Sequence, residues 1–81
     1  MTRRDDQFTL SGETFTRTWV GDNSGRYEWS SSDGRLVVWR EGREYRATLD
    51  TYPSTKAWLT LTAAMAASIM SREKYDQRRA A

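Results

Sequence analysis

The chain has 81 residues, of which 37% are hydrophobic and 30% charged, and it contains neither cysteine nor histidine. This length suits one hydrophobic core, so the sequence predicts a single domain over residues 1–81. Without cysteine there is no disulfide or thiolate zinc site, and without histidine the commonest acid–base group and imidazole ligand are missing. The composition therefore argues against an enzyme, a cofactor or a metal site, and for a protein that works by binding.

No hydrophobic segment is long enough to cross a membrane or to direct secretion. The longest apolar-leaning stretch, residues 57–70, is interrupted by Thr60, Thr62 and Ser68 and is shorter than the roughly 20 residues required. The polar residues 1–7 are expected to form a flexible tail rather than a signal peptide. Together with the lack of cysteine, these features predict a cytoplasmic protein that contacts no membrane.

Residues 8–49 have the pattern of an antiparallel meander of three to four strands. Alternation over residues 14–20 predicts one strand, and residues 26–31, 35–40 and 43–49 predict the next three. Composition places a loop at residues 21–25, and Asp33-Gly34 and Glu41-Gly42 are the expected hairpin turns. Phe8 and Leu10 precede these strands across residues 11–13, which form either a tight turn or a bulge.

Strand parity predicts which face of this meander is buried. With the expected turns, Trp29 faces Val38, Val38 faces Tyr45, and a pair between Trp19 and Tyr27 fits the first loop. One face then collects nine apolar side chains: Phe15, Trp19, Tyr27, Trp29, Leu36, Val38, Tyr45, Ala47 and Leu49. We expect this face to form the core.

A helix is predicted over residues 54–76, after Pro53 ends the extended region and with Ser54 or Thr55 as its N-cap. A stripe at helical spacing, Trp58, Leu61, Met65 and Ile69, should pack across the apolar face of the meander. The fold class is therefore α+β: an antiparallel meander against one long C-terminal helix. A second flank of small residues, Ala63, Ala64, Ala67 and Ser71, reflects either helix propensity or a homodimer contact.

The opposite sheet face carries the candidate partner-binding residues, which are Trp39, Val37, Arg26, Arg46, Glu28 and Glu44. Trp39 beside Val37 is unusual on a polar face, and Trp and Arg are over-represented at binding hot spots. Two alternatives stay open. Residues 1–13 could instead cover Trp39 through Phe8 or Leu10, and Glu28 with Glu44 could form a carboxylate pair rather than a solvated face.

The strand–strand–strand–helix order resembles the DNA-binding domain of phage integrase arm-binding modules and plant ethylene-response factors. Residues 45–55 look like the end of that sheet leading into its helix. The resemblance implies that the sheet enters the major groove, with Arg26, Arg46 and Trp39 touching bases and phosphates. Glu28 and Glu44 depart from that pattern, because each would repel phosphate.

The short length, the mixed charge with a net +2 and the lack of cysteine also resemble the small phage-encoded antagonists of host defence, including anti-CRISPR proteins. That resemblance implies a protein that binds and blocks a bacterial nucleoprotein complex. Loop carboxylates would stand in for phosphates, and here these are Asp22, Asp33, Glu41 and Asp50. Balanced charge favours this protein-binding hypothesis over direct nucleic-acid binding. A structural or assembly subunit is the third alternative.

Overall fold

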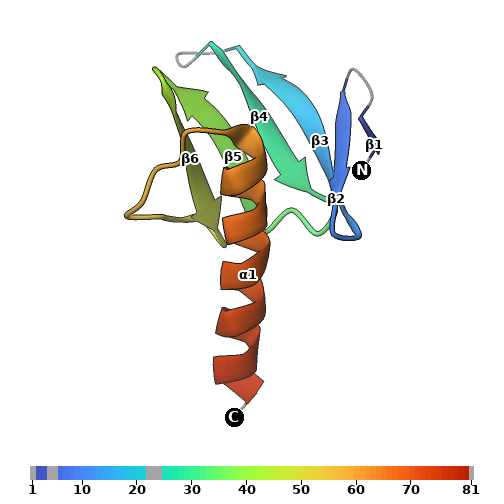
Figure 1. Ribbon diagram of the computed structural model, residues 1–81, viewed down its shortest axis with the longest axis vertical. Helices are drawn as coiled ribbons and strands as arrows, with labels where there is room; N and C mark the ends of the chain where they lie inside the picture. Colours follow the sequence, from blue (N-terminus) through green and yellow to red (C-terminus); the bar gives the residue numbers. More distant parts are fainter. Residues whose placement is uncertain (1, 4–5, 22–24, 81) are drawn as a thin grey trace.

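The computed structural model describes residues 2–3, 6–21 and 25–80, which form one antiparallel sheet and one helix (Figure 1). The elements are β1 (Thr2–Arg3), β2 (Gln7–Leu10), β3 (Glu13–Val20), β4 (Arg26–Ser31), β5 (Leu36–Glu41), β6 (Glu44–Leu49), β7 (Tyr52–Pro53) and α1 (Leu61–Ala80). The strands pair in chain order, so the sheet is a continuous meander. The α+β class and the meander against one C-terminal helix are confirmed, but the sheet has seven strands rather than three to four.

Two of the additional strands come from the N-terminal segment. Gln7 begins β2, and Thr2–Arg3 forms β1, so the predicted tail over residues 1–7 is wrong for these residues; residues 1, 4 and 5 lie outside the described part. β2 pairs with β3 through Phe8↔Phe15. The connection is a tight turn rather than a bulge, because Ser11 and Gly12 both have positive φ, 52° and 77°.

The β4–β5 hairpin confirms the predicted register, since Trp29 lies opposite Val38. In the β5–β6 hairpin the turn is Gly42-Arg43 rather than Glu41-Gly42, so Val38 faces Ala47 and not Tyr45. Gly42 has a φ of 66°, a conformation that glycine adopts without steric cost. This shift of two residues leaves every side chain on its predicted face, because strand side chains alternate with period two.

The helix begins at Leu61 rather than at residue 54, and it continues to Ala80 rather than residue 76. Residues before it stay extended because Trp58 forms an isolated β-bridge with Tyr45, with N···O distances of 2.7 and 3.0 Å. Thr60 is the actual N-cap, since its Oγ1 accepts a hydrogen bond from the backbone N–H of Ala63. In the described part of the chain, no helix is both long and apolar enough to cross a membrane.

The core lies between the helix and the face of the sheet that it covers. Its buried members are Phe8, Phe15, Trp29, Leu36, Val38 and Ala47 from the sheet and Ala64 and Met65 from the helix. The predicted helical stripe is confirmed: Met65 is fully buried, and Trp58, Leu61 and Ile69 pack against this core. Two residues assigned to the core are not buried there, because Trp19 is 55% exposed and Tyr27 48% exposed.

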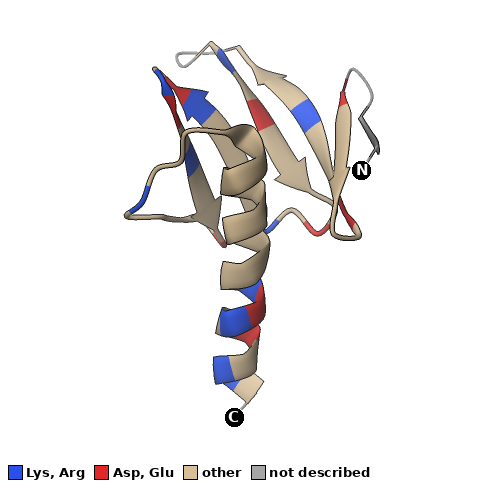
Figure 2. Ribbon diagram, viewed as in Figure 1, with Lys and Arg blue, Asp and Glu red and all other residues tan. Residues whose placement is uncertain are grey.

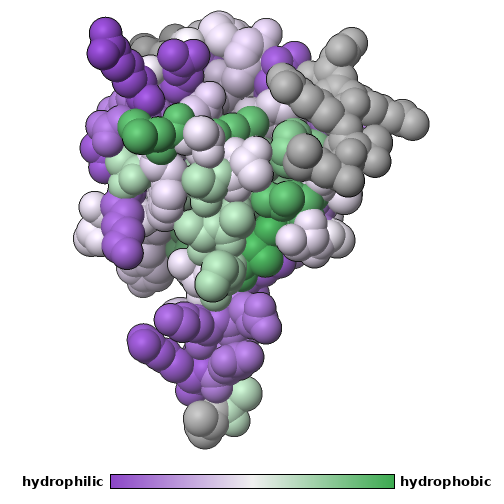
Figure 3. Space-filling view, viewed as in Figure 1, coloured by the Kyte–Doolittle hydropathy of each residue, from purple (hydrophilic) through white to green (hydrophobic). Residues whose placement is uncertain are grey.

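Two arginines tie the helix to the turns at one end of the sheet. Arg72 donates to Glu13 and to Asp33, and Arg35 donates to Asp50 and Asp76. Figure 2 shows charged residues gathered on the C-terminal half of α1, which extends beyond the sheet, and Figure 3 shows the same part as strongly hydrophilic. The overall extents are therefore 40 × 27 × 22 Å.

These ion pairs shift the acidity of the carboxylates. Burial alone would raise the pKa of Glu13, but hydrogen bonds from Arg72 and Ser32 outweigh it and lower the pKa. Burial would likewise raise the pKa of Asp33, but hydrogen bonds from Ser31 and the Arg35 backbone N–H, with the charge of Arg72, lower it. Hydrogen bonds from Arg35 lower the pKa values of Asp50 and Asp76.

Candidate functional site

The outer face of the sheet, which points away from the helix, brings most of the predicted site residues together. Glu28 lies opposite Trp39, and Trp39 lies opposite Arg46, so these three form one row across β4, β5 and β6. Val37 is two residues from Trp39 on the same face. The β5–β6 register places Arg46, rather than Glu44, opposite Trp39. The row therefore runs from a carboxylate through an indole to a guanidinium.

Arg26 covers Trp39. Its guanidinium carbon lies 4.3 Å from the centre of the indole ring, a cation–π contact, while the same guanidinium bonds Glu28 at 2.8 Å. Trp39 is half-buried, and its Nε1 is buried without a hydrogen-bond partner among the described residues. Arg26, Glu28 and Trp39 are thus held in one arrangement before any partner arrives.

The alternative in which the N-terminal residues bury Trp39 is wrong for Phe8 and Leu10. β2 pairs only with β1 and β3, so β3 and β4 separate it from the strand that carries Trp39. Phe8 is 5% exposed and contributes to the core on the helix side, and Leu10 packs against that core. Both side chains therefore point away from the outer face.

Glu44 lies at the edge of this group. It faces Glu41 at the tip of the β5–β6 hairpin and is exposed, while Arg46 lies 3.9 Å from Glu41. Glu28 belongs to a different cross-strand row, with β5 between it and Glu44. The two carboxylates that could have formed a hydrolytic pair are thus placed apart, and Glu28 is paired with Arg26.

A second surface, which sequence reasoning missed, lies on the helix side of the sheet. We call it the open end and define it by Arg17, Trp19, Tyr27 and Arg40. Trp19 and Tyr27 pair across β3 and β4 with ring centres 4.9 Å apart, and the Arg17 guanidinium lies 4.4 Å from the centre of the Tyr27 ring. Parity placed both aromatic residues on the core face correctly. Their exposure could have been inferred from the sequence, because a helical stripe of four residues is too short to cover nine apolar positions on the sheet.

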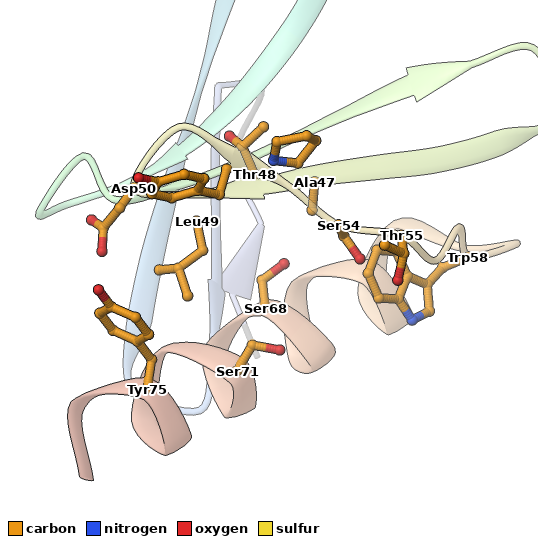
Figure 4. Close-up of a pocket in the computed structure, with 12 residues that line it drawn as sticks. Ala47, Thr48, Leu49, Asp50, Ser54, Thr55, Trp58, Ser68, Ser71 and Tyr75 are labelled. Atoms are coloured by element: carbon orange, nitrogen blue, oxygen red, sulfur yellow. The ribbon is translucent and has the colours of Figure 1, made fainter. Parts of the chain in front are cut away.

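A cleft of about 400 Å³ lies between α1 and the chain that follows β6. Figure 4 shows Ser68 and Ser71 of the helix opposite Ala47 and Leu49. Two of its polar groups are already engaged, since Ser68 donates to the carbonyl of Ala64 at 2.8 Å and Asp50 is paired with Arg35. The walls of this cleft are mainly apolar.

The described residues also include no group of three or more acidic, histidine or cysteine side chains that could hold a metal ion. The arrangement on both sheet faces is instead one of aromatic rings, guanidinium groups and carboxylates, which can stack and form ion pairs. Comparison with known proteins identifies no matching family model, no similar curated protein and no similar solved structure.

Proposed function

We propose that this chain is a non-enzymatic protein-binding module whose outer face docks on a bacterial nucleic-acid-handling defence complex and blocks it sterically or electrostatically. The observation that carries the binding mode is the row Glu28–Trp39–Arg46 with Arg26 stacked on the indole. The choice of target comes from the resemblance in size and composition to anti-CRISPR proteins.

Preorganisation supports a protein partner on this face. Side chains that are already fixed by mutual contacts lose little rotamer freedom on binding, so more of the interaction energy appears as affinity. Here Arg26 is fixed by both Glu28 and Trp39, and the row presents both signs of charge around one aromatic ring. Trp and Arg surrounded by polar residues are typical of binding hot spots.

The same geometry disfavours a DNA duplex on the outer face. Arg26 is paired with Glu28, and Arg46 lies near Glu41, so each arginine that would approach a phosphate has a carboxylate beside it. Moving a phosphate into this row would bring it against Glu28 and Glu41, which repel it. A partner that supplies both cationic and anionic groups fits the row better.

The test is affinity capture from bacterial lysate with the tagged chain, with and without nuclease, followed by a binding measurement with the recovered complex. We expect a nuclease-resistant protein complex, and we expect Trp39→Ala to weaken its binding by at least ~2 kcal/mol. Arg46→Glu should weaken binding similarly, and it keeps the test informative if Trp39→Ala unfolds. Arg78→Ala, an exposed arginine on the distant part of α1, is the matched control.

Capture of nuclease-sensitive material alone, with no nuclease-resistant protein complex, would overturn the proposal in favour of direct nucleic-acid binding. Unchanged affinity in folded Trp39→Ala and Arg46→Glu variants would also overturn it, because the outer face would then make no contact. A mass that rises with protein concentration, in the absence of any captured complex, would favour the assembly-subunit alternative.

A further inference from the structure

The open end carries a pair of exposed aromatic rings in contact with each other. Trp19 and Tyr27 are 55% and 48% exposed although they lie on the same face as the core. Their rings meet edge to face at an interplanar angle of 64°, and Arg17 packs against Tyr27 while lying 5.8 Å from the Trp29 ring. Exposed rings of this size are costly to leave in water, and such a surface commonly marks an interaction site.

A hollow of about 400 Å³ adjoins Tyr27, whose other neighbour is the Trp19 ring, at the place where the β4–β5 ladder ends. The ladder between the two strands ends at Glu28↔Trp39, so Tyr27 and Arg40 lie beyond the last pair. The described residues around the hollow are Arg17, Arg26, Tyr27, Trp29, Arg40, Gly42, Tyr45 and Leu61. The separation of the strands gives this end of the sheet a concave floor flanked by guanidinium groups.

The charge of the open end differs from that of the outer face. None of the described residues that line the hollow is acidic, and within the described chain neither Arg17 nor Arg40 forms an ion pair. The Nε of Arg40 donates to the carbonyl of Gly42 at 2.9 Å, which leaves its terminal nitrogens for other acceptors. The occupant that fits is therefore anionic.

We infer that the open end binds single-stranded nucleic acid, with bases stacked on Trp19 and Tyr27 and phosphates bound by Arg17 and Arg40. Exposed rings beside a positive groove are the features by which proteins bind single strands, because every base has a face that can stack. A duplex keeps its base faces covered, so it could use the arginines but not the rings. An acidic protein segment is the competing occupant.

The four residues that define this surface are not part of the outer-face site, which shares only Arg26 with the lining of the hollow. The inference therefore extends beyond the proposed function and is tested without its partner. The purified chain is titrated against fluorescently labelled oligothymidylate and oligouridylate of about 12 nucleotides, within the usual site sizes. The same titration is made with a duplex of equal length and with a polyglutamate peptide. We expect saturable binding of the single strands, at least about tenfold tighter than binding of the duplex or the peptide, and weakening with salt.

Four variants separate stacking from charge. Trp19→Ala should weaken single-strand binding by about tenfold or more without changing its salt dependence. Arg17→Ala and Arg40→Ala should each weaken binding and also reduce the slope of log affinity against log salt by about 0.7. In Gly21→Ala the new Cβ would collide with the indole of Trp19, so binding should weaken although no ring or charge is lost.

Tyr52→Ala and Arg78→Ala are the matched controls, since they remove an exposed aromatic residue and an exposed arginine elsewhere on the chain. Both should bind the oligonucleotides within about twofold of the parent. Equal binding of duplex and single strand, or equal losses in controls and open-end variants, would overturn the inference. Binding of polyglutamate without binding of either oligonucleotide would overturn it in favour of a protein occupant.

Discussion

Arg72 provides the sharpest test of how the helix is held on the sheet. Its side chain is 17% exposed and joins Glu13, which is 11% exposed, to Asp33, which is 40% exposed. Arg72→Met keeps much of the aliphatic packing but leaves the Glu13 carboxylate with hydrogen bonds from Ser32 alone. The perturbation therefore removes a guanidinium from one largely buried and one half-exposed carboxylate.

The expected magnitude follows from these exposures. Removing one partner of a fully buried pair costs about 3–5 kcal/mol, whereas an exposed pair contributes about 0–1 kcal/mol. The contact of Arg72 with Glu13 is closer to a fully buried pair, and its contact with Asp33 is closer to an exposed pair. We expect Arg72→Met to lower the free energy of unfolding by about 2–3 kcal/mol, which corresponds to a Tm lower by about 10–20 °C for a domain of this size.

The assay is urea unfolding at pH 7, followed by tryptophan fluorescence, for Arg72→Met, Glu13→Gln and the double variant. If the ion pair carries the effect, the double-mutant cycle gives a coupling free energy of about 1–3 kcal/mol. Arg78→Met, on the exposed part of the same helix, should change stability by no more than about 0.5 kcal/mol. A coupling below about 0.5 kcal/mol, or an equal loss in Arg78→Met, would refute the reasoning.

Two further predictions concern the backbone at Thr51 and the carboxylates that are paired with arginine. Thr51 has a φ of 72°, which is strained for a β-branched residue. Thr51→Gly should therefore raise the free energy of unfolding by about 0.5–1 kcal/mol, measured by urea unfolding. A loss of stability would contradict this. The pKa values of Glu13, Asp33, Asp50 and Asp76 are lowered in the folded chain, so the stability they contribute is present above their ordinary values of 4.5 for Glu and 3.8 for Asp. It is lost as pH falls through the lowered values, and a Tm that stays constant from pH 5 to pH 2 would contradict this.

Strand parity was the part of the fold that the sequence predicted best. The face on which a strand side chain lies depends only on whether its position is odd or even in the strand. The wrong turn at Glu41-Gly42 therefore still left Trp39 and Arg46 on the outer face. The β2 strand could not be predicted with the same strength, because Gln7–Leu10 is only four residues long and follows a polar segment. Its pairing depends on the tight turn at Ser11-Gly12, for which Ser is an unusual first residue.

The outer-face group was predicted from composition, but its internal contacts were not. Trp39 was expected either to be exposed or to be covered by the N-terminal residues, and it is instead covered by Arg26, one of the other candidate residues. A cation–π contact between adjacent strands depends on the diagonal reach of a long side chain, which parity does not specify. Parity did not reveal the role of Arg72 either, because its partners Asp33 and Glu13 are 39 and 59 residues away in the chain.

The late start of the helix was the main error in its predicted bounds, and Trp19 and Tyr27 are left exposed on the face that the helix covers only in part. A helix beginning at residue 54 would be longer at its N-terminal end by seven residues, or about 10 Å. Trp58 prevents this, because its backbone pairs with Tyr45 and its indole packs against the core from an extended segment. The first helical turn therefore begins at Leu61, which lines the same hollow as Tyr45, and the aromatic pair stays uncovered. Because Tyr45 both pairs with Trp58 and lines the hollow, we expect replacing Trp58 to disturb the core and the open end together, whereas Trp19→Ala disturbs only the surface.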